Sequence, residues 1–323
     1  MSTALTITVR GDRLELGPVR VSFQRTLRIP ETGMHALPPG LGRFPLRRVA
    51  DYPETAPADW LARGGVMMPL YQREAMWMLF DSDEPAALQV GVGRVCAISG
   101  ERWDEALTED PQNYAALPEQ PWLDGINAGK GFIRQFVAVP LGLGATVEAQ
   151  VTGSEGIGGV QLRAVGLTDD ALSAWQEDQE RPIDFVVADG APMLLSSPDM
   201  GLGAGGRMKQ EVYADDRFLS DYDEKRSGRV FVHLCSAAQW SAITGEVPPP
   251  TPVDRETYIE HGLPWFDYYD ADREDLAPSD TLGSIRTVGD VLATDEPPFV
   301  PIDPGTVIQL KGDGGDAVED GEW

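Results

Sequence analysis

Histidine, cysteine and lysine are scarce in this chain, and their scarcity limits the chemistry to expect. The three histidines, His35, His233 and His261, share no i, i+4 spacing, and no paired cysteines stand near them. The usual zinc-binding patterns are therefore missing. Two cysteines could form one bridge but no disulfide framework, and both stand in apolar, strand-like runs. We expect Cys96 and Cys235 to be buried core residues in a reducing compartment.

Long apolar runs are also missing. The longest near-apolar run, residues 136–147, is interrupted by a proline and two glycines, and it falls short of the roughly 20 residues that cross a bilayer. The first ten residues alternate as a strand does and lack the features of a secretory signal. We therefore expect a soluble, cytoplasmic protein with no membrane partner.

Positive charge is scarce relative to negative charge. The chain has 52 acidic and 26 basic residues, which gives a formal net charge of -26. This excess opposes a close approach to phosphate backbones, so nucleic acid is not an expected partner. The apolar fraction of 42% is enough to fill the core of one large or two ordinary domains.

The familiar catalytic templates are absent as well. The chain contains no Gly-x-Ser-x-Gly elbow, His-Glu-x-x-His, Cys-x-x-Cys or kinase signature. The glycine-rich stretch 152–158 matches neither the dinucleotide fingerprint nor the phosphate loop. The sequence therefore predicts no cofactor and favours a protein that is not an enzyme, although carboxylates brought together by folding would leave no local mark.

Short alternating runs separated by Gly and Pro turn pairs are what the sequence does contain. They predict a mainly β fold, either a β-sandwich or an irregular β-barrel, with a few short helices and a smaller acidic carboxy-terminal extension. We expect a hairpin formed by residues 146–151 and 159–165, and helices over 168–179 and 236–244. The predicted divisions are a main body, a Pro-rich spacer, an appendage and a disordered acidic tail, over residues 1–247, 248–252, 253–310 and 311–323 respectively.

The acidic and aromatic part of the appendage carries two weaker hypotheses. Asp270, Asp272 and Glu274 match the first ligand positions of a calcium loop, but the required glycine and the final glutamate are missing, so a solvated acidic turn is the simpler interpretation. A neighbouring aromatic cluster could dock on another chain or pack within this one; it consists of Trp265, Phe266, Tyr268 and Tyr269.

Two of the four lysines stand in glycine-rich segments that also carry arginine, at residues 122–135 and 200–210. Glycine allows successive backbone N–H groups to converge on an anion, and a cation at the rim adds charge. We therefore predict two basic turns that bind an anion. The alternative is that the glycines make tight turns and the cations pair with nearby carboxylates. The residues nominated are Lys130, Arg134, Gly205, Gly206, Arg207 and Lys209.

Four segments resemble a little-characterised family of bacterial and fungal proteins that often carries the automatic label "integral membrane protein". The resemblance implies no activity, cofactor or site residue, and the label conflicts with the hydropathy, which we follow. The segments are MPLYQREAMW (68–77), QPWLDGINAGKGFIRQF (120–136), MGLGAGGRMKQ (200–210) and HGLPWFDYYD (261–270).

The sequence leaves three functional hypotheses. The first is a cytoplasmic binding or assembly protein of unknown ligand that is not evidently catalytic, with self-association or a protein partner. The second is an enzyme acting on a small anionic substrate held by the two basic turns, with an unidentified carboxylate as acid or base. The third is a self-assembling structural protein. The second hypothesis requires the two glycine-rich segments to lie close together in the fold.

Overall fold

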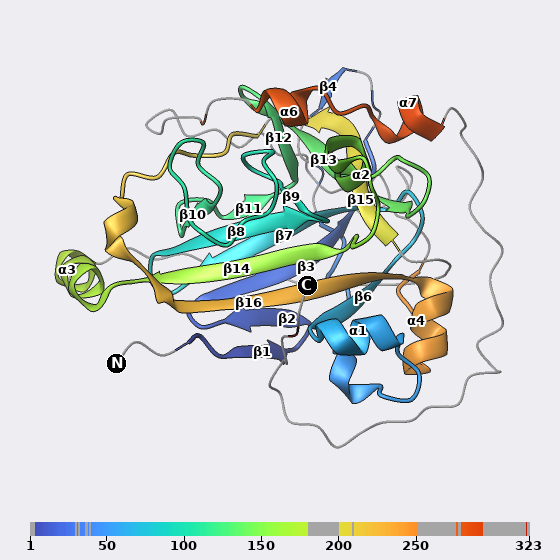
Figure 1. The fold of residues 1–323 in the computed structure, drawn as a ribbon, viewed down its shortest axis with the longest axis horizontal. Coiled ribbons are helices and arrows are strands. Elements are labelled where there is room, and N and C mark those ends of the chain that lie inside the picture. Colours follow the sequence, from blue (N-terminus) through green and yellow to red (C-terminus); the bar gives the residue numbers. More distant parts are fainter. Residues whose placement is uncertain are drawn as a thin grey trace.

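The computed structural model describes residues 4–29, 31, 33–35, 38, 40–179, 200–208, 210–250, 276, 279–292 and 321. In this part of the chain the protein is mainly β, with two mixed sheets packed together and few, short helices (Figure 1). The described strands form no closed barrel. The predicted mainly β class is therefore confirmed, in its two-sheet form.

The strands follow the alternating runs of the sequence, because side chains of a strand point to opposite faces in turn. In chain order they are β1 (Ile7–Arg10), β2 (Arg13–Leu16), β3 (Val19–Thr26), β4 (Met34–His35), β5 (Arg47–Arg48), β6 (Val66–Leu70), β7 (Ala75–Ser82), β8 (Ala86–Val92), β9 (Val95–Cys96), β10 (Ala115–Leu117), β11 (Trp122–Leu123), β12 (Gly125–Gly129), β13 (Phe132–Pro140), β14 (Val160–Leu167), β15 (Met200–Met208) and β16 (Tyr222–Ser236).

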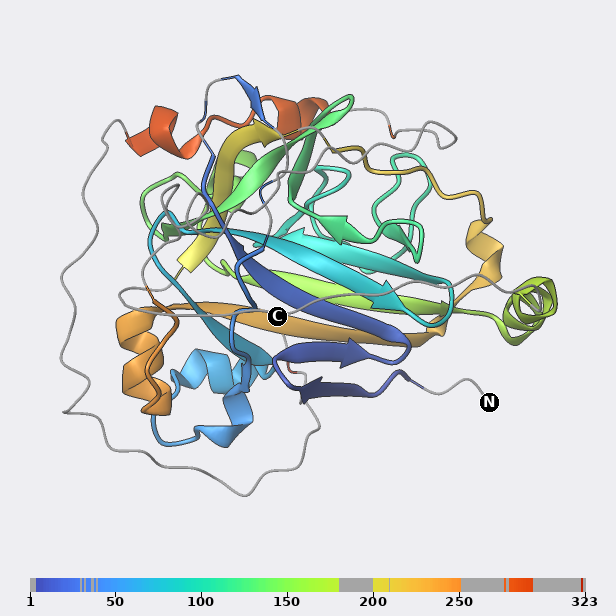
Figure 2. The ribbon, with the colours of Figure 1, turned by 180° about the vertical axis from the view of Figure 1, so that it is seen from behind.

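The first sheet begins with the amino-terminal meander and runs in the order β1-β2-β3-β7-β13-β15. Strands β3 and β7 pair antiparallel in continuous register, from Val19 opposite Ser82 to Thr26 opposite Ala75. The short strands β4, β11 and β12 pair with β15, β7 and β13 respectively, and β4 runs parallel to β15. Figure 2 shows the dark-blue meander beside β7.

The second sheet runs in the order β6-β16-β14-β8-β10, and β6 is parallel to β16. A single residue pair, Met200 with Leu234, connects its strand β16 to β15 of the first sheet. Apolar side chains from both sheets form one continuous core, which includes Phe23 and Phe136 from the first sheet and Leu88 and Val232 from the second.

The helices lie at the ends and edges of the sheets. Helices α1 and α4 lie together beside β6, whereas α6 and α7 lie on the opposite side, over β12 and β15 (Figures 1 and 2). Their bounds, with those of the two short 3-10 helices, are η1 (Val49–Asp51), α1 (Ala58–Arg63), α2 (Val147–Thr152), α3 (Asp169–Gln179), η2 (Leu219–Asp221), α4 (Ala237–Thr244), α6 (Asp280–Gly283) and α7 (Val288–Leu292).

Two of the predicted helices are confirmed, because α3 and α4 occupy the expected residues. The predicted hairpin is wrong, because residues 147–152 form α2 and β14 pairs with β8 and β16 instead. Thr146 caps the start of the helix, where its side chain accepts a hydrogen bond from the backbone of Ala149, and Gly153 caps the end in the left-handed conformation. These end signals outweigh the alternation of apolar residues between them.

The described residues beyond position 247 lie against the main body. The hydroxyl of Tyr71 donates to the carbonyl of Pro249 at 3.2 Å, and Arg25 donates to the carbonyl of Pro250. Leu282 belongs to the core shared by both sheets, and Val288 packs with β13. These parts of the predicted spacer and appendage are therefore packed on the β body.

Candidate functional site

The two glycine-rich basic segments of the sequence lie side by side in the fold. Strand β13 pairs antiparallel with β15, and Arg134 and Arg207 are directly opposite each other. Their side chains therefore leave the same face of the sheet. We call Arg134 and Arg207 the basic strand pair. The spatial convergence that a joint anion site requires is present for these two residues.

The second segment is not a turn, and that prediction is wrong. Residues 200–208 form strand β15, and Gly205 and Gly206 are buried within it. The register shifts here, so that both glycines lie opposite the single residue Gln135, which makes a β-bulge. A Cβ on Gly205 would lie 2.6 Å from Cγ2 of Val137. This glycine therefore permits close strand packing rather than forming a loop of N–H groups around an anion.

The first segment does contain a turn, between β12 and β13. Gly131 has a φ of +70° and Lys130 is exposed at the tip. The left-handed conformation favours glycine at position 131, whereas a Cβ on Gly129 would lie 2.0 Å from the ring of Phe132, which would then have to move. The ring of Phe132 also lies 5.6 Å from the Arg207 guanidinium carbon, a cation–π distance.

Neither arginine of the basic strand pair forms an ion pair in the described part of the chain. Arg134 is half-buried, and its Nε has no hydrogen-bond partner there. The pKa of Arg134 lies below its ordinary value, chiefly because burial disfavours the charge and then because Arg207 repels it. The guanidinium stays protonated at neutral pH, so the two like charges oppose each other.

Two carboxylates attract Arg134 from a distance, but both are engaged elsewhere. Glu31 accepts hydrogen bonds from Arg28 at 2.6 Å and from the backbone N–H of Gly289 at 2.9 and 3.0 Å. Asp290 accepts from the backbone of Thr287 at 3.2 Å, and its pKa is lowered, first by the Thr287 side chain. The basic strand pair is therefore balanced only partly by its surroundings.

The other nominated residues fall outside the described ranges, and the hypotheses about them stay predictions. They are Lys209 of the anion site, the acidic set Asp270, Asp272 and Glu274, and the aromatic set Trp265, Phe266, Tyr268 and Tyr269. Among the residues that are described, no cluster of three or more potential metal ligands occurs. No helix in that same part of the chain is long and apolar enough to cross a membrane.

The two cysteines and His233 are packed in the core of the protein. Cys96 and Cys235 are buried, as predicted, and neither forms a disulfide in the described part of the chain; burial raises the pKa of the Cys96 thiol. His233 is also buried, with Nε2 3.0 Å from the carbonyl of Gly64 and its ring stacked on Trp60. Burial lowers the pKa of His233 to about 3, so it is a neutral core residue.

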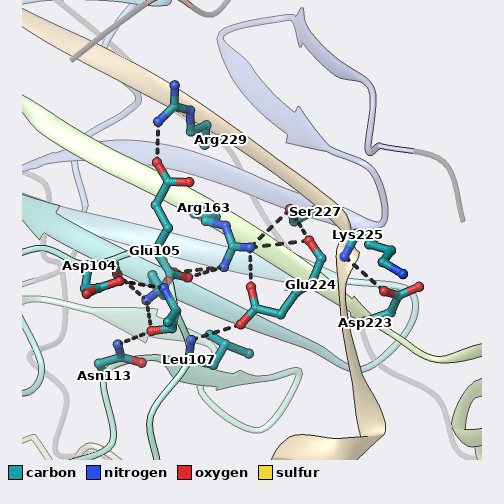
Figure 3. A network of polar contacts seen from close by, with 12 residues as sticks. Asp104, Glu105, Leu107, Asn113, Arg163, Asp223, Glu224, Lys225, Ser227 and Arg229 are labelled. Atoms are coloured by element: carbon teal, nitrogen blue, oxygen red, sulfur yellow. Dashed lines mark hydrogen bonds and ion pairs between the residues drawn. The ribbon is translucent and has the colours of Figure 1, made fainter.

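Sequence reasoning missed the polar network around the buried Arg163 (Figure 3). This β14 side chain is 5% exposed and donates to Gln89, Ser227 and the carboxylate of Glu224. The other carboxylate oxygen of Glu224 accepts from the backbone of Leu107, so the network ties the loop after β9 to the second sheet. The alternation of Val160, Leu162 and Ala164 places Arg163 on the polar face of β14, so no local pattern indicated its burial.

Comparisons of the chain with protein-family models, curated proteins and solved structures found no significant match. The functional argument therefore rests on the geometry described above.

Proposed function

We propose that this chain binds a small inorganic oxyanion, such as phosphate, between Arg134 and Arg207. The observation that carries the proposal is the direct pairing of the two arginines on β13 and β15, with no ion pair to either in the described residues. Two adjacent cations repel each other. An anion between them would offset this repulsion and accept a charge-assisted hydrogen bond from each arginine.

Binding fits this surface better than catalysis. Asp290 and Glu31 are the carboxylates that act electrostatically on Arg134, and both accept hydrogen bonds from backbone N–H groups. The pKa of Asp290 is lowered, first by the hydrogen bond with the Thr287 side chain and then by the one from the Thr287 backbone N–H. A carboxylate with a lowered pKa is a weak general base at neutral pH. The exposed Lys130, on the turn that leads into β13, adds positive charge nearby.

The test is a thermal-unfolding titration with inorganic phosphate, compared with potassium chloride at equal ionic strength. At about 100 times its dissociation constant, phosphate should stabilise the protein by roughly 2.7 kcal/mol. Arg134→Gln and Arg207→Gln should each weaken phosphate binding about tenfold or more, because a hydrogen bond to a charged group contributes about 1.5–3 kcal/mol.

Lys225→Gln is the matched control, because Lys225 is an exposed cation on β16, away from the basic strand pair. It should leave the phosphate effect unchanged. Without phosphate, Arg207→Gln should cost no more than about 1 kcal/mol, the scale of its contact with Phe132. Equal loss of phosphate stabilisation in all three variants, or none in either arginine variant, would contradict the proposal.

A further inference from the structure

A cavity lies away from the basic strand pair, where the turn after β8 meets the loop after α2. It has a volume of about 270 Å³ and is lined by side chains from two distant stretches of the chain. We call it the Trp103 pocket, after its aromatic wall. Its polar and aromatic lining residues are Arg94, Arg102, Trp103, Thr152, Ser154 and Gln161. The volume lies just below the range of about 300–1,000 Å³ for drug-sized ligands, so it suits a smaller molecule.

The inner wall of the pocket offers an acceptor with nothing bound to it. Gln161 on β14 is 1% exposed, and its Nε2 donates to the carbonyl of Gly158 at 3.2 Å. Its Oε1 is buried and has no hydrogen-bond partner among the residues that the structure describes. A buried polar atom left unpaired costs roughly 1–3 kcal/mol. This oxygen therefore favours a ligand that brings a hydrogen-bond donor to the inner end.

Trp103, the aromatic wall of the pocket, can pack closely on β8 because the residue beneath it, Gly91, has no side chain. A Cβ on Gly91 would lie 2.6 Å from Cε3 of Trp103 and 2.7 Å from Oε1 of Gln161. The indole and the amide thus share the space above Gly91. The backbone N–H of Trp103 donates to the carbonyl of Arg94 at 2.9 Å, which joins the wall to the β8–β9 turn.

The mouth of the pocket carries two exposed arginines. Arg102 forms no ion pair in the described residues, and the carboxylate paired with Arg94 is that of Glu148, at the outer limit of 3.9 Å. Glu148 is itself 1% exposed and accepts from the backbone N–H of Gly158 at 2.9 Å. It thereby holds the loop that forms one side of the pocket. In a chain with a net charge of -26, two exposed cations around one cavity select for an anion.

We propose that the Trp103 pocket binds a hydroxylated organic anion of sugar-acid size. The acidic group pairs with Arg94 and Arg102 at the mouth, a hydroxyl donates to Oε1 of Gln161 inside, and the carbon frame packs on Trp103. The hydroxyl groups of Thr152 and Ser154 supply further polar contacts at the side. This site is separate from the basic strand pair, since its residues come from the β8–β9 turn, the loop after β9, the end of α2 with the loop that follows, and β14.

The experiment titrates the full-length protein with D-glucuronate, with D-glucose as the uncharged probe and acetate as the probe without hydroxyls. Binding is followed by calorimetry and by the indole N–H resonance of Trp103, assigned with Trp103→Phe. Glucuronate should bind at least about tenfold more tightly than either control probe, as expected when both an ionic and a hydrogen-bonding contact are made.

Two variants separate the contacts. Arg102→Gln should reduce the preference for glucuronate over glucose, and Gln161→Leu should reduce the preference for glucuronate over acetate. Arg207→Gln should change neither, which distinguishes this site from the phosphate site. Equal binding of all three probes, an unmoved Trp103 resonance with millimolar glucuronate, or unchanged preferences in both pocket variants would overturn the proposal.

Discussion

Asp124 lies between β11 and β12, and only 2% of its surface is exposed, so its carboxyl group is removed from water. One carboxyl oxygen, Oδ2, has no hydrogen-bond partner there. Burial raises the pKa of Asp124 from 3.8 to about 8, and the side chains of Trp122 and Gln210 oppose this shift only in part. The folded protein therefore holds this group protonated at neutral pH.

This raised pKa predicts a specific pH dependence of stability. As pH rises from about 4 to about 8, the unfolded chain loses the Asp124 proton while the folded chain keeps it. The free energy of unfolding then falls by about 1.4 kcal/mol per pH unit from this group. Asp124→Asn should remove that loss, so the variant gains on the natural protein as pH rises through this window.

Urea unfolding at a series of pH values measures the difference. The exposed Asp216→Asn is the control, and it should show no comparable trend. A difference between Asp124→Asn and the natural protein that stays constant from pH 4 to pH 8 would contradict this account.

Arg25 and Glu74 form a buried ion pair, with side chains 2% and 1% exposed. Nε and Nη2 of Arg25 donate to Oε1 of Glu74 at 2.8 and 2.7 Å, and the backbone of Tyr71 donates to Oε2 at 3.0 Å. Either single change, Arg25→Met or Glu74→Met, should lower the free energy of unfolding by about 3–5 kcal/mol, because it leaves one buried charge unpaired.

The double variant should lose much less than the sum of the two single losses, since replacing both charges removes the desolvation cost of each. Chemical denaturation of the four proteins in this cycle gives the coupling energy directly. If the loss of unfolding free energy in the double variant equals the sum of the two single losses, the ion pair is not the reason for those losses.

Particular residues show how far sequence reasoning reaches at this scale. Cys96 and Cys235 could be predicted as buried, because each stands in an apolar, strand-like run, whereas the alternation around His233 indicated only a half-buried position and the structure buries it fully. The buried state of Asp124 could not, since 52 acidic residues look alike in sequence and only the fold decides which one loses its water.

At the scale of the element, the positions of glycine explain both the strands that were predicted correctly and the strand that was predicted wrongly. The amino-terminal meander was predictable from alternation and turn pairs, and the strands β6, β7 and β8 were predictable from short apolar runs bounded by turns. Strand β15 was not, because a glycine-rich run usually weakens a strand. Its glycines are explained only by neighbours: a Cβ on Gly203 would lie 2.7 Å from Cγ2 of Val288, from a distant part of the chain.

Gly125 in β12 provides a test of this explanation. A Cβ there would lie 1.9 Å from the carbonyl oxygen of Arg134, which is backbone and cannot rotate away. Gly125→Ala should therefore displace β12 from β13 and destabilise the protein by about 1–3 kcal/mol, the usual cost of overpacking. It should also weaken the phosphate effect, because it shifts the strand that carries Arg134.

Gly156→Ala is the matched control, since a Cβ at that position would meet nothing within 4 Å. Its stability should equal or slightly exceed that of the natural protein, by up to about 1 kcal/mol, through the reduced freedom of the unfolded chain. Thermal unfolding compares the two. Equal stability of both variants would show that the β12–β13 contact is not close packed.

At the scale of the whole molecule, the net charge of -26 repels anions from the surface as a whole. Binding of an anion therefore requires a patch of positive charge. The sequence indicated which two segments carry lysine and arginine, but not how the sheet places them relative to each other. The fold placed Arg134 opposite Arg207 through a pairing between residues more than seventy positions apart. Such register is set by long-range strand pairing, which no local pattern specifies.

The most direct test of the account is diffraction from crystals grown or soaked with selenate, whose anomalous signal locates the anion without reference to the protein. The account predicts selenate between the guanidinium groups of Arg134 and Arg207, with its oxygens about 2.7–3.2 Å from nitrogens of both. Selenate sites elsewhere with none between these arginines, or guanidinium groups that are each paired with a carboxylate instead, would contradict it.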